Sequence, residues 1–180
     1  MLSPFAKNLL GHIKKDTARR NSQRSMDWLR NKIIKDPRNI KSSKPTVGRM
    51  YLFVYDAKHK DKLPFWDINP VIILIGAAKG GFYGVNFHYL NMEDRIELLE
   101  MMVPFQKLVD ARNRRQISIS YDKLLRFSKT KWKYCFKHYL LAQLHTQLVE
   151  IPMTEWYETI TLPIAHFKGA TSQQVWKGAR

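Results

Sequence analysis

The sequence feature that most limits the possible folds is a pair of apolar segments joined by a short glycine turn. Val71–Ile75 is rich in β-branched residues, and Phe82–His88 follows it after Lys79-Gly80-Gly81. β-Branched side chains favour strands, and glycine accepts the positive φ angles of tight turns. The pattern therefore predicts an antiparallel hairpin. A third strand, buried on both faces, is predicted at Met50–Tyr55 because all of its side chains are apolar or aromatic.

Helical patterns follow these strands. Asn91 is placed to cap a helix over residues 92–103, which Pro104 would end or kink. Lys131–Val149 has the longest helical pattern, and a further short helix is predicted around Trp156. The prediction is an α+β fold, in which a small antiparallel sheet is packed by C-terminal helices. A short SH3-like barrel is one form that such a sheet can take.

Charge is concentrated at the two ends of the chain. The 180 residues carry a formal net charge of +16, of which residues 1–45 contribute +9, residues 46–110 contribute −1 and residues 111–180 contribute +8. A charge that served only solubility would be spread more evenly. The distribution predicts two basic surfaces attached to a nearly neutral folding core. A polyanion, most often nucleic acid, is the partner that such surfaces favour.

The same pass along the chain predicts three parts. Residues 1–35 form a basic helical N-terminal arm, because apolar residues recur there at helical spacing between arginines. Residues 36–46 are polar and contain two prolines, which is typical of a linker. Residues 47–180 form the α+β core domain. The acid-poor, amphipathic start of the arm is also typical of a mitochondrial presequence, so a basic mitochondrial protein remains an alternative.

The candidate nucleic-acid-binding residues are basic side chains at the two ends. Arginine binds phosphate through paired hydrogen bonds, and lysine binds it as a point charge. Neutralising several phosphates releases counterions, which gives binding that is independent of sequence and sensitive to salt. The predicted phosphate contacts are Arg19, Arg20 and Arg24 in the arm, with Arg112, Arg114, Arg115, Lys129, Lys133 and Lys137 downstream. The alternative is a solvated face, or a surface that docks onto acidic protein.

Catalysis and metal binding are not expected. Asp56-Ala57-Lys58 has the Asp-x-Lys spacing of a nuclease strand end, but only Asp61 or Asp67 could supply the second carboxylate and no wider motif supports it. The single cysteine, Cys135, excludes an intramolecular disulfide and a cysteine-cluster metal site, and a buried packing role is favoured for it. We expect a protein that is not an enzyme and has no cofactor, no metal, no small-molecule substrate and no membrane partner.

Alternating aromatic residues in the first strand offer a second route to nucleic acid. Tyr51, Phe53 and Tyr55 share one face, as the stacking platforms of single-strand binders do. The opposite face, with Met50 and Val54 among its residues, is equally apolar. A strand that is apolar on both faces is more typical of a packed core, so we expect these rings to be buried.

The central part of the chain resembles a known family of small virion proteins from T4-like myophages, cyanophages and marine phages among them. Two long blocks carry most of the resemblance, and five shorter ones support it. They are Gly48–Asp67 and Gly80–Leu90, followed by Ile119–Asp122, Lys137–Leu140, Glu150–Trp156, Leu162-Pro163 with Phe167-Lys168, and Val175–Lys177. One departure is Asn91, where relatives tend to have proline. The arm resembles the family only in being basic.

Members of this family are commonly labelled DNA end protector proteins. The resemblance implies a virion protein that travels with the genome and shields the ends of packaged double-stranded DNA from host exonucleases. A structural component of the tail, baseplate or neck, docked onto neighbouring virion proteins through its arm and basic surfaces, is the first alternative. A head-completion nuclease that needs Asp56 is the second. No active-site residue comes with the resemblance, and the loop Lys58–Asp67 fits a structural or a docking role equally well.

Overall fold

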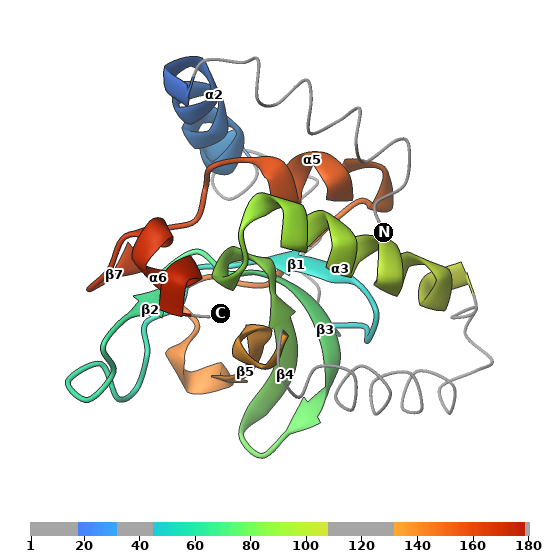
Figure 1. Ribbon diagram of the computed structural model, residues 1–180. Helices are drawn as coiled ribbons and strands as arrows, with labels where there is room; N and C mark the ends of the chain where they lie inside the picture. Colours follow the sequence, from blue (N-terminus) through green and yellow to red (C-terminus); the bar gives the residue numbers. More distant parts are fainter. Residues whose placement is uncertain (1–17, 32–44, 108–131, 179–180) are drawn as a thin grey trace.

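A computed structural model describes residues 18–31, 45–107 and 132–178, and over these residues the chain has an α+β fold (Figure 1). The main sheet contains β1 (Met50–Leu52), β3 (Val71–Ala78), β4 (Gly81–Asn86), β5 (Phe136–Leu140) and β6 (Val149–Ile151). A two-stranded sheet pairs β2 (Trp66–Asp67) with β7 (Phe167–Lys168). The α-helices of the described residues are α2 (Ala18–Arg30), α3 (Met92–Lys107), α5 (Trp156–Thr161) and α6 (Ser172–Gly178). Single 3₁₀ turns are η2 (Phe87–Tyr89), η3 (Lys133–Cys135), η4 (Leu141–Gln143) and η5 (Met153–Glu155).

The main sheet is antiparallel throughout and has the order β5-β4-β3-β1-β6. The predicted hairpin is confirmed as β3 and β4, and Gly80 turns between them at a φ of 71°. The predicted first strand is confirmed in part, because the regular pairing of β1 ends at Leu52. Phe53 and Tyr55 nevertheless stay buried, and Tyr55 forms an isolated bridge to Leu144.

Both faces of β1 and β3 are covered, each by a different kind of core. One face contributes Met50, Leu52 and Ile73 to a cluster that the helices complete. The other contributes Tyr51 and Phe53 to an aromatic cluster. The ring of Tyr139 from β5 meets Phe53 and Tyr55 edge to face, with centroids 5.1 and 5.0 Å apart. The alternating aromatic residues of the first strand are therefore core residues, as expected.

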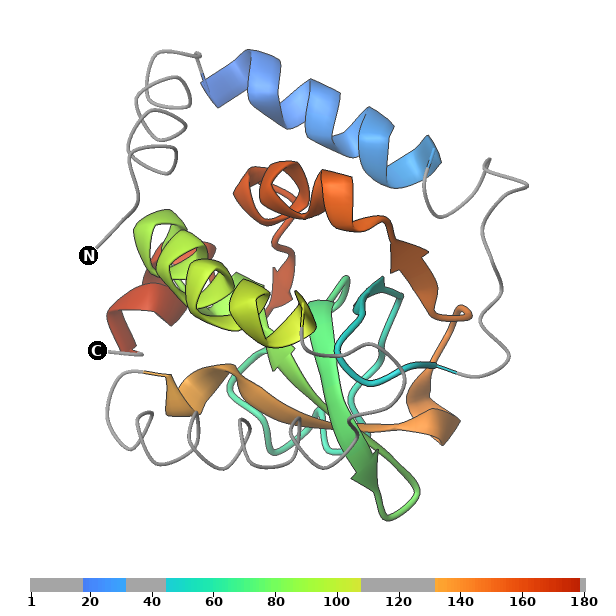
Figure 2. The ribbon, with the colours of Figure 1, turned by 90° about the vertical axis from the view of Figure 1, so that its right-hand side faces the viewer.

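The helices lie on one side of the main sheet, with α3 packed against α5 (Figure 2). The predicted cap of α3 is confirmed, because the Asn91 side chain accepts a hydrogen bond from the Asp94 amide at 3.0 Å. Pro104 does not end the helix, which continues to Lys107; the missing proline donor costs one backbone bond and the helix tolerates it. α2 lies beside α5 and contributes Leu29 to the helix-side core.

The predicted helix over 131–149 is wrong. The segment instead forms η3, β5, η4 and then β6. Aromatic residues spaced for a helix also suit a strand, and β4 offers an open edge where Tyr139 pairs with Phe82 and Lys137 with Gly84. The backbone bonds of this ladder and the packing of Tyr139 outweigh the local helical preference. No helix among the described residues is long and apolar enough to cross a membrane.

Candidate nucleic-acid interface

The predicted phosphate-binding residues are divided between described and undescribed parts of the chain. In α2, Arg24 is exposed, and the backbone positions of Arg19 and Arg20 lie one turn and more before it on the same helix. Lys133 and Lys137 lie in η3 and β5. Four further candidates lie outside the described residues: Arg112, Arg114, Arg115 and Lys129.

Lys133 and Lys137 do not share a helix face, because their segment is not a helix. Lys133 is exposed, and its Nζ lies 5.1 Å from the centroid of the Tyr134 ring. Lys137 is half-buried, with its Nζ 3.8 Å from the centroid of Tyr89. Burial lowers the pKa of Lys137, and the nearby Cys135 side chain partly opposes this shift. Since no carboxylate among the described residues pairs with Lys137, its charge is stabilised by a ring face rather than by an anion.

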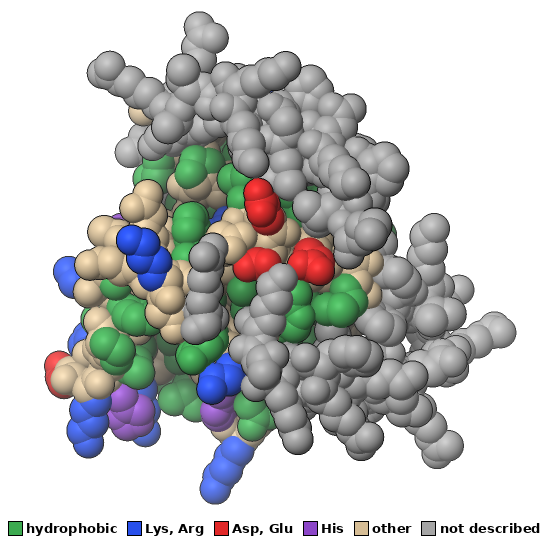
Figure 3. Space-filling model, viewed as in Figure 1, with side chains coloured by type: hydrophobic (Ala, Val, Ile, Leu, Met, Phe, Trp, Pro, Cys, Tyr) green, Lys and Arg blue, Asp and Glu red, His purple; other side chains and the backbone are tan. Residues whose placement is uncertain are grey.

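A cavity of about 660 Å³ opens beside Lys137. One wall is the loop of residues 57–65, here called the cavity loop, and the opposite wall runs from Tyr134 to Leu140 through β5. Val175 and Gly178 of α6 close part of it. This is the size range of sites for small ligands, about 300–1,000 Å³. In the space-filling view, Lys and His side chains gather along the lower edge of the described surface, toward the cavity loop (Figure 3).

Two lysines face the cavity from opposite walls. Lys58 is exposed on the cavity loop, and Lys137 comes from β5; these two are here called the lysine pair. His59 and His138 also line the cavity, and both are exposed. Neither member of the lysine pair has a carboxylate partner among the described residues. Asp67 is the one acidic residue among the described residues that line the cavity, so positive charge predominates in this part of the lining.

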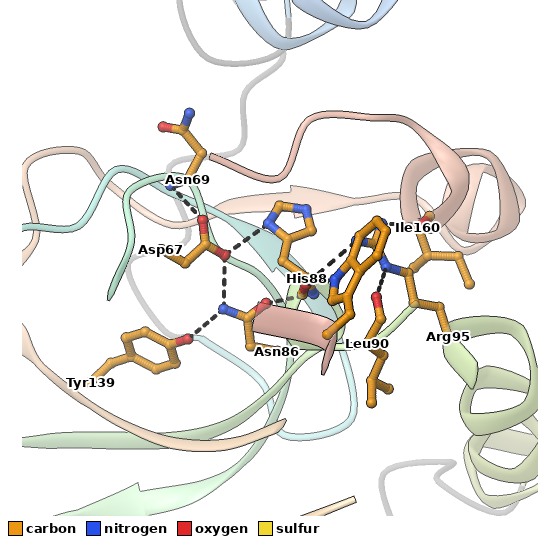
Figure 4. Close-up of polar contacts among 9 residues, drawn as sticks. Asp67, Asn69, Asn86, His88, Leu90, Arg95, Tyr139 and Ile160 are labelled. Atoms are coloured by element: carbon orange, nitrogen blue, oxygen red, sulfur yellow. Dashed lines mark hydrogen bonds and ion pairs between the residues drawn. The ribbon is translucent and has the colours of Figure 1, made fainter. Parts of the chain in front are cut away.

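The carboxylate of Asp67 accepts three hydrogen bonds from other groups of the chain, as the close-up shows (Figure 4). Its side chain is 3% exposed. One carboxylate oxygen accepts from the Asn69 amide at 3.1 Å, and the other accepts from Asn86 Nδ2 at 2.9 Å and from His88 Nδ1 at 2.8 Å. A carboxylate that already accepts three hydrogen bonds has little capacity left for a cation in the cavity.

The same network reaches the cavity wall through Tyr139. Asn86 Nδ2 also donates to the Tyr139 hydroxyl at 3.0 Å, and the Asn86 Oδ1 accepts from the His88 amide at 2.9 Å. Burial raises the pKa of Tyr139 well above its ordinary value, so the phenol is neutral. Asp67, Asn86, His88 and Tyr139 are here called the polar wall. Hydrogen-bonded buried networks of this kind fix side-chain positions, so the cavity is preformed on this side, although His88 Nε2 is buried without a hydrogen-bond partner among the described residues.

Arg95 and Trp176 attach α6 to the polar wall. Arg95 is 2% exposed and donates to the carbonyls of Leu90 and Ile160 at 2.8 and 2.9 Å. Burial lowers the pKa of Arg95 to about 10. Its guanidinium lies 5.4 Å from the centroid of Trp176, whose Nε1 donates to the His88 carbonyl at 2.8 Å. The helix that closes part of the cavity is thus held by a buried arginine that does not face it.

The nuclease alternative gains no geometric support. Asp56 forms an ion pair at 2.8 Å with Lys60, four residues further along the chain. Within the described ranges, no three His, Cys, Asp or Glu side chains come together in a way that could hold a metal ion. Cys135 is fully buried, and burial raises the pKa of its thiol to about 12, which fits the packing role expected for it.

The interpretation of the basic residues missed the most organised part of this surface. The sequence alone predicts only that Lys58 and His59 belong to a loop with a docking or structural role. It predicts Asn86 and His88 as strand residues. The signal that could have found them is the strength of the two sequence blocks Gly48–Asp67 and Gly80–Leu90, because the structure brings their ends together at Asp67 and Asn86.

Comparison with known proteins gives one match. A family model described as phage T4 terminal DNA protecting protein matches residues 1–179, nearly the whole chain. No curated protein and no solved structure matches it.

Proposed function

The chain belongs to the family of the phage T4 terminal DNA protecting protein, and from this membership we propose that it binds the ends of packaged double-stranded DNA in the virion. The observation that carries the proposal is the extent of the match, residues 1–179, which includes both basic ends and the central sheet. The name of the family describes protection of terminal DNA, which requires affinity for DNA and a way to obstruct its ends.

The charge of the chain supports the affinity. A net charge of +16 on 180 residues attracts polyanions over long range. Arg24 and Lys133 are exposed cations on the described surface, and Lys58 adds a third. We propose that phosphates are contacted by these residues and by Lys137, together with Arg19, Arg20, Arg112, Arg114, Arg115 and Lys129.

Protection in this proposal is steric. An exonuclease must draw a DNA terminus into its own active site, and a terminus held against this protein cannot enter. No bond is made or broken, so the proposal needs no catalytic residue and no metal. The described residues supply what it does need, a rigid sheet and cations that have no carboxylate partner among these same residues.

The experiment compares a blunt linear duplex with the same sequence closed at both ends by hairpin loops. Binding of each DNA is measured across a salt series, and a parallel series adds a double-strand exonuclease with Mg²⁺. We expect tighter binding to the linear duplex and resistance of its ends to digestion. The protein and DNA with Mg²⁺ alone, without exonuclease, control for cleavage by the protein itself.

Two substitutions test the phosphate contacts. Arg24→Gln and Lys133→Gln should each weaken binding to both DNAs equally and lower the salt slope by about 1. Lys79→Gln, an exposed lysine of the β3–β4 turn, is the control with the same change of charge. Equal, weak binding of both DNAs without any protection would contradict the proposal. The basic surfaces would then be docking surfaces for acidic virion proteins, as in a tail, baseplate or neck component.

A further inference from the structure

We infer that the cavity between the cavity loop and β5 receives the terminal nucleotide of a DNA strand, with its phosphate beside the lysine pair and its base against the aromatic lining. The inference rests on the proposed function and makes it more specific. It assigns the preference for ends to one place in the molecule. The general affinity for DNA then belongs to the exposed cations outside the cavity.

The chemistry of the lining matches the two halves of a nucleotide. Lys58 and Lys137 reach the cavity from opposite walls and have no carboxylate partner among the described residues. Phe65, Trp66 and Tyr134 are half-buried and present ring surface to the same cavity. Lysine binds a phosphate as a point charge, and aromatic rings stack on any base. Such a site would accept a nucleotide without regard to sequence.

The environment of Lys137 favours an anion. Its Nζ lies over the Tyr89 ring, and burial lowers its pKa because no negative group compensates for the lost water. A phosphate in the cavity would supply that group. Among the described lining residues, the acidic or histidine side chains are Asp67, which accepts hydrogen bonds from three donors, and the exposed His59 and His138; apart from the lysine pair, the remaining titratable groups there are tyrosine hydroxyls.

The size of the cavity explains why an end would be preferred. About 660 Å³ accommodates one nucleotide but not a base-paired duplex. An internal nucleotide could enter only after leaving the base stack on both sides and breaking its pair. A terminal nucleotide is stacked on one side alone and costs less to extract. A cavity for a single nucleotide therefore converts general DNA affinity into selection of ends.

The cavity is also rigid enough to select. The polar wall holds Asp67 and Tyr139 in place, and the indole of Trp176 fixes α6 by its bond to the His88 carbonyl. A captured terminal nucleotide would be withheld from an exonuclease, which must bind that same nucleotide. Binding of the terminal nucleotide would then itself protect the DNA end.

The test measures end selectivity, defined as the ratio of dissociation constants for closed-end and linear duplexes of one sequence. Wild type is compared with Lys58→Gln, with Tyr134→Ala and with the control Lys79→Gln, which removes one exposed positive charge outside the cavity lining. Lys58 is exposed, so its substitution leaves the fold intact, and far-UV circular dichroism confirms this for every variant. We expect Lys58→Gln and Tyr134→Ala to lower end selectivity several-fold while binding to closed-end DNA changes no more than in Lys79→Gln.

A second measurement alters the DNA and leaves the protein unchanged. Linear duplexes are prepared with an abasic site as the terminal nucleotide of each strand, so that the phosphates remain and the bases are missing. If a base stacks in the cavity, wild-type end selectivity falls by about fivefold or more. Tyr134→Ala should then respond less to the missing base than wild type does.

The outcomes separate the two proposals. If wild type selects linear DNA but both cavity variants and the abasic ends leave the selectivity unchanged, the cavity is not the site, and end binding itself stands. If wild type shows no selectivity and no protection, the proposed function fails and the inference fails with it. If Lys79→Gln lowers selectivity as much as Lys58→Gln, general charge is responsible and the cavity assignment is overturned.

Discussion

The two sides of the cavity are built from opposite kinds of polar group. The polar wall contains buried groups whose hydrogen bonds are made within the chain, such as the three that reach Asp67. The cavity loop carries exposed lysines, of which Lys60 pairs with Asp56, whereas Lys58 has no carboxylate partner among the described residues. Satisfied buried groups contribute to stability and position, whereas unpaired surface cations contribute little to either. The difference indicates that the polar wall is the scaffold and that the lysine pair is available to a ligand.

The largest effect on stability is expected from removing the carboxylate of Asp67, the acceptor in the polar wall. Asp67→Ala removes the acceptor of the buried His88 ring, of the Asn69 amide and of one of the two Asn86 Nδ2 hydrogen bonds, and unsatisfied buried donors cost free energy. The expected loss is about 3–5 kcal/mol of unfolding free energy, measured by urea denaturation. Asp61→Ala, an exposed carboxylate of the cavity loop, is the control and should change stability by less than about 0.5 kcal/mol. Equal losses of unfolding free energy at the two positions would contradict the distinction between the polar wall and the cavity loop.

The next effect concerns the strand that brings Lys137 and Tyr139 to the cavity. A Cβ atom on Gly81 would lie 1.8 Å from the Tyr139 carbonyl oxygen, so Gly81→Ala must separate β5 from β4. We expect a loss of about 2–3 kcal/mol and reduced end selectivity. Gly76→Ala is the matched control, because a Cβ there meets nothing within 4 Å. A Gly81→Ala protein as stable as Gly76→Ala would show that β5 is not held in this register.

A smaller effect on stability, with the opposite sign, is expected when Lys137 is substituted. Because burial lowers its pKa, the charged form costs free energy in the folded state, and Lys137→Met should stabilise the protein by about 1 kcal/mol. The same substitution should lower end selectivity, since it removes half of the lysine pair. A variant that is less stable than wild type would show that the cation–ring contact outweighs the cost of burial.

The difference in stability between wild type and Lys137→Met should change with pH in a defined direction. The unfolded chain binds the Lys137 proton more tightly than the folded protein does, so wild-type stability rises as pH increases between the lowered pKa and 10.5. The advantage of Lys137→Met should therefore be complete at neutral pH and shrink toward pH 10. Parallel urea denaturations of both proteins across this range measure it. A difference that stays constant with pH would show that Lys137 titrates normally.

The smallest change in stability is expected at Lys58. Lys58→Gln alters an exposed side chain with no ion pair among the described residues, so unfolding free energy should change by less than about 0.5 kcal/mol. End selectivity should nevertheless fall, as the cavity assignment requires. A variant that loses stability and selectivity together would place Lys58 in the scaffold instead.

Local sequence was sufficient for the central hairpin and the cap of α3. The β-branched run of β3 and the positive φ of Gly80 are short-range properties that any packing must respect. Asn91 caps α3 through a hydrogen bond to Asp94, three residues along the chain. The charge distribution and the Gly48–Asp67 and Gly80–Leu90 blocks were likewise sufficient to identify the family that the comparison confirms.

Only the tertiary structure decided the course of residues 132–149 and the composition of the cavity. The spacing of aromatic residues in that segment suits a helix, but the open edge of β4 and the rings of Phe53 and Tyr55 draw it into the sheet. That change turns Lys137 toward the cavity loop instead of toward Lys133. Lys58 and Lys137 are 79 positions apart in the sequence, and no local pattern relates two residues so distant. Whether both residues line the same cavity depends on strand pairing, which is a long-range property of the folded chain.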